Sequence, residues 1–206
     1  SIEAYHRTIL DGLQAFFYRT GPITLPTAPP AQRVLVAFGS DHGLCGNYNE
    51  VLATAVMAEL EGVAPSVPAR RVLCVGAQLQ DALRSQGLVP DQVLLPPAST
   101  DGIGRLAGDI VTRLDAIGQG DLHNRIAFTL VFTQRSGLGL QEPVVRQLLP
   151  LSPDLLPARM ERSWASRSLP DYTLSPDDLF AALLRNHIFA SVFRAAAEAM
   201  VTENGA

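Results

Sequence analysis

The sequence predicts an α/β protein: a mostly parallel sheet with helices on both faces, flanked by two terminal helices. Short apolar runs typical of buried strands alternate with amphipathic segments of about ten to fifteen residues, which is the pattern of a parallel sheet. A glycine-rich turn at residues 39–46 joins the first such strand to the first helix. Because a strand, a glycine-rich turn and a helix open a Rossmann-like unit, we expect that architecture here.

Composition supports a folded chain and excludes several functions. The 206 residues are 47% apolar and 17% charged, with a net charge of −4. No basic run is present, so binding to nucleic acid or to a membrane surface through electrostatics is not expected. All basic residues are arginine, which excludes both a Walker-type phosphate loop and a catalytic lysine.

The cysteine count and the hydropathy predict the cellular compartment in which the protein lies. Cys45 and Cys74 are too few for a disulfide framework, so we expect a reducing environment. No apolar run reaches the roughly 18 residues of a membrane span, and no signal-peptide pattern is present. The sequence therefore predicts a cytosolic protein, or one peripheral to a membrane that another subunit spans.

The first segment, residues 1–19, is predicted to be a helix. Ile2, Tyr5, Ile9 and Leu13 recur at helical spacing and form one apolar stripe. We identify no convincing capping residue before this stripe, so the chain is expected to begin within a helix. A proline-rich connector follows at residues 20–32.

The middle of the chain alternates between strands and helices. Thr100-Asp101 can cap one helix, and the last long strand shows apolar residues at alternate positions. The predicted strands are residues 33–38, 71–75, 92–95, 125–133 and 143–151, and the predicted helices are residues 48–60, 77–86 and 100–114.

The C-terminal part is predicted to end in a long helix. Residues 152–172 form a polar, proline-punctuated segment that contains Trp164. Ser175-Pro176-Asp177-Asp178 is a good helix start, and the apolar pattern then continues to about residue 202. Two terminal helices of this kind predict an antiparallel pair that the chain contains only in part. We therefore divide the chain into residues 1–28, 29–160 and 161–206, with the globular domain in the middle.

The glycine-rich turn is the one candidate for chemistry. Asp41, His42 and Cys45 suggest a thiol nucleophile beside an imidazole, near a helix N-terminus. A small buried cysteine is more often packing, and residues so close in one turn rarely reach catalytic geometry. The turn could instead hold a phosphate, as in a nucleotide-binding enzyme, although its spacing is not G-x-G-x-x-G and no acidic residue ends the second strand.

Other polar residues have structural explanations. His6 and His187 lie on predicted helices, His123 lies in a polar loop, and no pair has metal-ligand spacing. The Asp177-Asp178 pair is explained by helix capping. The last helix lacks the basic face of a membrane-surface helix, so we expect it to pack against another helix. We accordingly predict no catalytic residue, no cofactor and no metal.

Several motifs, taken in order, resemble the gamma subunit of the F-type ATP synthase over roughly residues 33–206. The turn is similar to that family's S-[TD]-D-R-G-L-C-G-G-[LF]-N signature, and residues 147–151 resemble its Q-L-L-P-L. Ser163-Trp164 and Leu183-Leu184-Arg185 also resemble family motifs, as does the segment that ends in residues 202–206. The matching residues of the turn are Ser40, Asp41, His42, Gly43, Leu44, Cys45, Gly46 and Asn49.

The resemblance implies a non-catalytic rotor stalk of a bacterial enzyme. Its partners would be the alpha and beta subunits, the epsilon subunit and the c-ring, at the cytoplasmic face of the plasma membrane. It implies that the chain is the globular domain with stubs of a longer coiled coil. Expected interface residues are Trp164, Asp171, Tyr172, Arg185 and Glu203.

Two departures from the family pattern occur in the turn. His42 stands where the family usually has arginine, and Asn47 where a second glycine is common. Together with the absence of lysine, they indicate a divergent member. Two alternatives remain open from the residues alone: a Rossmann-like nucleotide-binding enzyme that uses residues 41–46, and a regulatory module that dimerises through its terminal helices.

Overall fold

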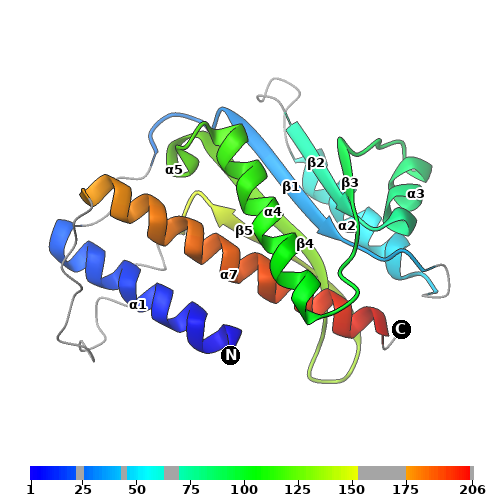
Figure 1. Cartoon of the computed structure of the whole chain (residues 1–206). Helices are drawn as coiled ribbons and strands as arrows, with labels where there is room; N and C mark the ends of the chain where they lie inside the picture. The colour runs from blue at the N-terminus through cyan, green and yellow to red at the C-terminus, as the bar shows by residue number, and fades with distance from the viewer. Residues whose placement is uncertain (22–25, 43–45, 63–69, 153–174, 205–206) are drawn as a thin grey trace.

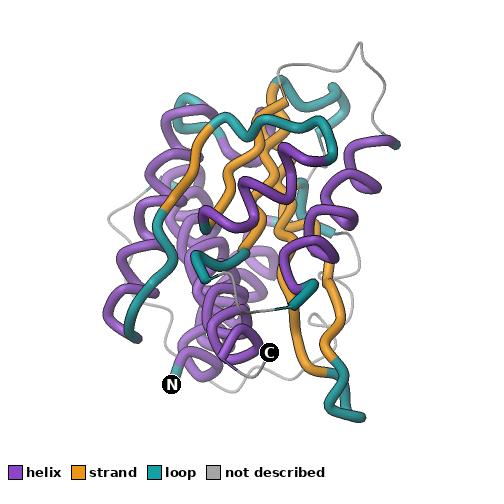
Figure 2. The backbone as a smooth tube through the Cα atoms, turned by 90° about the vertical axis from the view of Figure 1, so that its right-hand side faces the viewer, coloured by secondary structure: helices purple, strands orange, loops and turns teal. Residues whose placement is uncertain are grey.

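A computed structural model of the chain describes residues 1–21, 26–42, 46–62, 70–152 and 175–204. These residues form one sheet with helices on both faces, plus one helix that packs outside those layers (Figures 1 and 2). Among the described helices, none has the length and apolarity needed to cross a bilayer.

The sheet has five strands in the order β3-β2-β1-β4-β5, and the strand that follows the connector lies at its centre. Neighbours among the first four strands are parallel, whereas β5 is antiparallel to β4. Central β1 is buried over its last five residues, as expected for a strand covered on both faces. The strands are β1 (Gln32–Phe38), β2 (Arg70–Val75), β3 (Gln92–Leu94), β4 (Ile126–Arg135) and β5 (Gln141–Leu149).

Alternate residues of β1 point into two separate cores. Val34, Val36 and Phe38 pack with the two long helices α4 and α7, whereas Leu35 and Ala37 pack with α2 and α3. The alternation follows from the pleat of a strand, which sends successive side chains to opposite faces. The helices are α1 (Ile2–Thr20), α2 (Tyr48–Glu61), α3 (Ala77–Ser85), α4 (Thr100–Gly118), α5 (Leu122–Arg125) and α7 (Pro176–Asn204).

The long helix α7 packs on the sheet with one side and contacts α1 with another. Figure 1 shows α1 and α7 running side by side, with α1 on the side of α7 away from the sheet. Gly12 allows a close approach between them, because a Cβ on that residue would lie 3.2 Å from Leu183 Cδ2. The aromatic rings of Phe16 and Phe180 stack with centroids 5.7 Å apart, one helical turn from this close approach.

The predicted fold class is confirmed, including the mostly parallel sheet and the paired terminal helices. Two details of the sequence prediction were wrong. Residues 122–125 form the short helix α5 rather than a loop, and Ser1 caps α1 by accepting a hydrogen bond from the Ala4 amide at 3.3 Å.

Candidate functional site

The turn after β1 is held together by Asn49, from the first turn of α2. The Ser40 amide donates to Asn49 Oδ1 at 3.0 Å, and Asn49 Nδ2 donates to Ser40 Oγ at 2.9 Å. Ser40 is completely buried. Gly39 is needed beside this pair, because a Cβ there would overlap Leu79 Cβ and lie 2.7 Å from Asn49 Oδ1. The turn is therefore tightly packed at its start, at Gly39 and Ser40.

Asp41 of the same turn caps the next helix of the sheet. Its Oδ1 accepts from the Ala77 amide at 2.7 Å, at the N-terminus of α3, and the Gln78 amide donates to the Ser40 carbonyl oxygen at 2.9 Å. Gly76 permits this contact, because a Cβ on it would lie 2.5 Å from Ser40 O and its φ is +104°. The carboxylate thus lies at the N-terminus of α3, where its negative charge faces the positive end of the helix dipole.

The remaining signature residues divide into exposed and undescribed ones. His42 and Gly46 are exposed, and Gly46 has a positive φ of 57°. Gly43, Leu44 and Cys45 lie outside the described residues, so the predicted thiol–imidazole geometry stays untested.

The crevice between β1 and β4 is closed by the last turns of α7. In a doubly wound sheet the strand order reverses at this position, and ligands bind there beyond the carboxyl ends of the strands. Tyr48 Oη donates to the Ala199 carbonyl oxygen at 3.2 Å and lies 3.3 Å from Thr202 Oγ1. Thr202 Oγ1 lies 3.2 Å from the Thr133 carbonyl oxygen, and the Thr202 side chain is completely buried. Protein atoms therefore fill the position of a Rossmann-type ligand.

Glu203 lies at the edge of this closed crevice. Burial raises the pKa of the Glu203 carboxyl, His42 nearby lowers it, and Asp41 raises it. The three residues lie close enough for their charges to interact, so the structure joins one predicted interface residue to the signature turn. The sequence analysis did not predict the contact between Tyr48 and Thr202. The signal that could have indicated it is Thr202 itself, a polar residue in a largely apolar helix.

The described cysteine is not suited to nucleophilic chemistry. Cys74 is completely buried at the end of β2, and its thiol donates to the Gly76 carbonyl oxygen at 3.4 Å. Burial, with a smaller contribution from Asp41, raises the pKa of the Cys74 thiol to about 12. Because the thiolate is the nucleophile, this thiol is inert near neutral pH.

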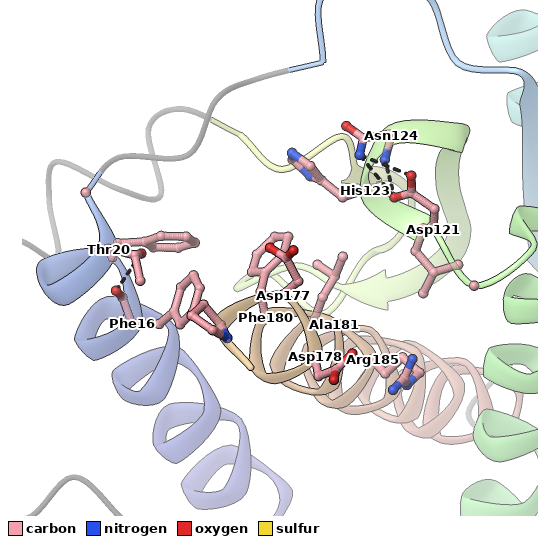
Figure 3. A pocket seen from close by; sticks show the side chains of 16 residues that line it. Phe16, Thr20, Asp121, His123, Asn124, Asp177, Asp178, Phe180, Ala181 and Arg185 are labelled. Atoms are coloured by element: carbon pink, nitrogen blue, oxygen red, sulfur yellow. Dashed lines mark hydrogen bonds between the residues drawn. The ribbon is translucent and has the colours of Figure 1, made fainter. Parts of the chain in front are cut away.

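An opening with a volume of about 650 Å³ lies where the end of α1, the short α5 and the start of α7 meet. Phe16, Phe17 and Phe180 form its apolar wall, and the His123 ring meets Phe180 edge-on with centroids 5.3 Å apart. Figure 3 shows Asp177, Asp178 and Arg185 along α7, with Asp121 opposite on the α5 side. The opening has an aromatic wall, and its polar side chains are three aspartates together with Thr20, His123, Asn124 and Arg185.

Of the five predicted interface residues, Arg185 lines this opening, and its Nε lies 3.8 Å from Asp115 Oδ2. Trp164, Asp171 and Tyr172 lie outside the described residues. Glu203 lies at the other end of α7, so the structure does not bring it together with Arg185. Among the described residues, no group of three histidine, cysteine or acidic side chains could hold a metal ion.

Fold and site together define a class of protein. The sheet is Rossmann-like, but its ligand crevice is filled by a long helix that also pairs with the N-terminal helix. The chain is therefore an α/β domain organised around one long helix, which the sheet and the N-terminal helix share.

Comparison with known proteins agrees with that class. The family model described as ATP synthase matches residues 1–206. The ATP synthase gamma chain of Verminephrobacter eiseniae is 32% identical over 170 residues, which are 81% of this chain and 55% of that protein. The gamma chain of Paraburkholderia xenovorans is 30% identical over 177 residues, 84% of this chain and 58% of that one. The chain thus belongs to the ATP synthase family, with gamma chains as its relatives, and spans a little more than half of their length.

Solved structures show the same fold. The central stalk and c-ring structure of the Tetrahymena thermophila mitochondrial ATP synthase contains a chain with a TM-score of 0.59 and 15% identity. The alignment covers 98% of this chain and 88% of that one. A rotor chain of the Euglena gracilis mitochondrial ATP synthase has a TM-score of 0.53 and 14% identity, covering 98% and 82%.

Proposed function

We propose that this chain is the central rotor stalk, or gamma, subunit of a proton- or sodium-translocating F-type ATP synthase. In that role it couples rotation of the c-ring to ATP synthesis or hydrolysis in the catalytic ring of alpha and beta subunits. It contributes no catalytic residue or cofactor, and its partners are the alpha, beta and epsilon subunits and the c-ring. It lies at the cytoplasmic face of the bacterial plasma membrane, held there through the membrane-embedded sector.

The observation that best supports this proposal is the double use of α7. This helix of 29 residues is part of the sheet's core and is also the partner of α1. A rotor needs a rigid connection between its helical shaft and its globular foot, because a flexible joint would dissipate torque. One helix that belongs to both parts provides that connection without a hinge.

The proposed parts follow the division of the chain. Residues 1–28 and 161–206 belong to the shaft and its approach, and residues 29–160 form the foot, whose core α7 completes. Trp164, Asp171, Tyr172, Arg185 and Glu203 are proposed to contact other subunits. With histidine at position 42, any contact made by the family's usual arginine at this position is lost or replaced.

The test is reconstitution. The chain, extended at both ends to the length of its relatives, is mixed with the alpha and beta subunits of the same genome. The expected result is a complex with one copy of this chain and a higher ATP hydrolysis rate than the alpha and beta subunits alone.

An Arg185→Ala variant with a matched Arg113→Ala control then examines the interface. Arg113 is a half-buried arginine of α4 whose Nε lies 3.1 Å from Asp109 Oδ2. Weaker binding of the c-ring and epsilon by Arg185→Ala alone is expected. Absence of any complex, together with a nucleotide-dependent rise in the melting temperature of the chain, would overturn the proposal in favour of a nucleotide-binding enzyme.

A further inference from the structure

Two histidines meet inside the contact between α1 and α7. His6 and His187 are 9% and 5% exposed, and His6 Nε2 lies 3.1 Å from His187 Nδ1. The ring centroids are 5.1 Å apart with an interplanar angle of 32°. Arg194 lies about two turns beyond His187 on the same face of α7, and its NH1 atom is 3.1 Å from His6 Nδ1. A chain of three basic side chains therefore links the two helices.

The guanidinium determines where the protons lie. Arginine can only donate, so His6 Nδ1 must accept and carries no proton. The His6 proton is then on Nε2, which donates to His187 Nδ1, and that nitrogen must also be bare. In this arrangement both rings are neutral, and each carries its proton on Nε2.

Among the described residues, the carboxylates of α1 and of the nearby part of α7 are exposed, where solvent screens them: Glu3, Asp11, Asp177, Asp178 and Glu198. Asp115 of α4 lies beside Arg185. The other described charged residues of α1, and those of α4 over the same stretch, are Arg7, Arg19, Asp101, Arg105 and Asp109.

We propose that His6, His187 and Arg194 form a pH-sensitive latch between α1 and α7, closed while both rings are neutral and released when either ring takes up a proton. A proton on His6 Nδ1 would face the Arg194 N–H, and a proton on His187 Nδ1 would face the His6 N–H. In both cases one hydrogen bond is replaced by two opposed donors, and a positive charge is added at a buried contact next to a guanidinium.

The pH range follows from the chemistry of histidine. A histidine in water takes up a proton near pH 6.5. The unfolded or undocked chain therefore binds protons below that pH that the closed latch excludes, so stability rises with pH through this range. The latch is closed at neutral pH and is lost as the pH falls toward about 5.5. What opens first is the contact of α1 with α7, because α1 lies on the outer side of α7 (Figure 1).

The first test needs no variant. Long-range ¹H–¹⁵N spectra of the chain at pH 7.5 are expected to show His6 and His187 as neutral rings with the proton on Nε2. Acidification is expected to protonate both rings over the same pH interval in which α1 loses its contacts with α7. A charged ring, or a proton on Nδ1 of either ring, at pH 7.5 would overturn the proposal.

The second test compares matched variants by urea unfolding at pH 7.5 and 5.5. Excluding one proton from the folded state raises the unfolding constant about tenfold when the pH falls from 7.5 to 5.5, so two neutral rings together account for about a hundredfold. His6→Gln is expected to lose about tenfold or more of that change, whereas His42→Gln, which removes an exposed histidine of the turn, keeps it. Equal pH dependence in His6→Gln and the wild type would contradict the latch.

Arg194→Leu isolates the role of the guanidinium. Without the fixed donor, His6 Nδ1 is free to carry a proton, so the pair can hold one shared positive charge. The expected result is a smaller acid-induced loss of stability than in the wild type. A loss as large as the wild type's would show that the arginine does not set the proton positions.

Discussion

At the scale of single residues, Asn49 has a role that its neighbours cannot take over. Its amide group accepts from the buried Ser40 N–H and donates to Ser40 Oγ. Replacing Asn49 with alanine leaves a buried amide without its partner, which costs about 1–3 kcal/mol. We expect Asn49→Ala to lower the free energy of unfolding by about 2–3 kcal/mol, measured by urea denaturation.

Asn47→Ala is the matched control for this prediction. Asn47 is exposed, precedes the same helix and makes no capping hydrogen bond through its side chain. Its replacement is expected to change the free energy of unfolding by less than about 0.5 kcal/mol, as for most surface substitutions. Equal losses in the two variants would contradict the specific role of the Asn49–Ser40 hydrogen bonds.

Cys74 predicts a loss of stability in alkali. Because the pKa of the folded-state thiol is raised to about 12 from an ordinary value of 9.0, the thiol ionises only in the unfolded chain between these values. The stability contributed by the protonated thiol is fully present below pH 9 and is lost as the pH rises from 9 toward 12. The loss of stability is about 1 kcal/mol at pH 10. The free energy of unfolding of Cys74→Ala should therefore fall less steeply from pH 8 to 10. Parallel curves for the two proteins would contradict this.

Sequence alone identified the turn at Gly39–Gly46 but not how its residues are used. The glycines predicted a sharp turn because few other residues tolerate its backbone and its packing. The sequence could not show that Asp41 caps α3, because that contact joins residues 36 positions apart. It also could not pair His6 with His187, since the register of two packed helices depends on the whole interface.

At the scale of elements, the N-terminus of α7 allows the contribution of a helix cap to the free energy of unfolding to be measured. Ser175 Oγ accepts from the Asp178 amide at 3.2 Å, and Asp177 and Asp178 face the positive end of the helix. Ser175→Ala is expected to cost about 1 kcal/mol in the free energy of unfolding. Ser99 precedes α4 without a capping hydrogen bond from its side chain, so Ser99→Ala should cost only a few tenths. The prediction fails if both substitutions cost the same in thermal or urea unfolding.

Element boundaries followed the sequence closely where one periodicity dominated. The strands β1 and β2 and the helices α2 and α3 agree with their predicted ranges to within one residue. Prediction was less accurate at the end of α4, which continues to Gly118, and around β5, which begins at Gln141 rather than Pro143 and ends at Leu149. This strand lies at the sheet edge with exposed residues along much of its length, so its hydrophobic pattern is weak.

At the scale of the whole molecule, α7 explains why the nucleotide-binding alternative could not be settled from sequence. The strand, glycine-rich turn and helix that begin with β1 are the local structure that a nucleotide-binding enzyme requires. The competing use of the crevice comes from Tyr48, Ala199 and Thr202, which are distant in sequence and meet only when α7 lies across the sheet. The local sequence of the turn cannot predict that a helix residue 151 positions further along the chain will close the crevice.

The same arrangement predicts an order of opening. The sheet, α4 and α7 share one core, whereas α1 packs on the outer side of α7 and contributes little to that core. Regions with few buried contacts open at lower free energy than the central strands. In native-state hydrogen exchange at pH 7, the amides of α1 should therefore exchange before those of β1, β4 and α7. Protection of α1 equal to that of β4 would mean that the helix pair and the sheet unfold as a single unit.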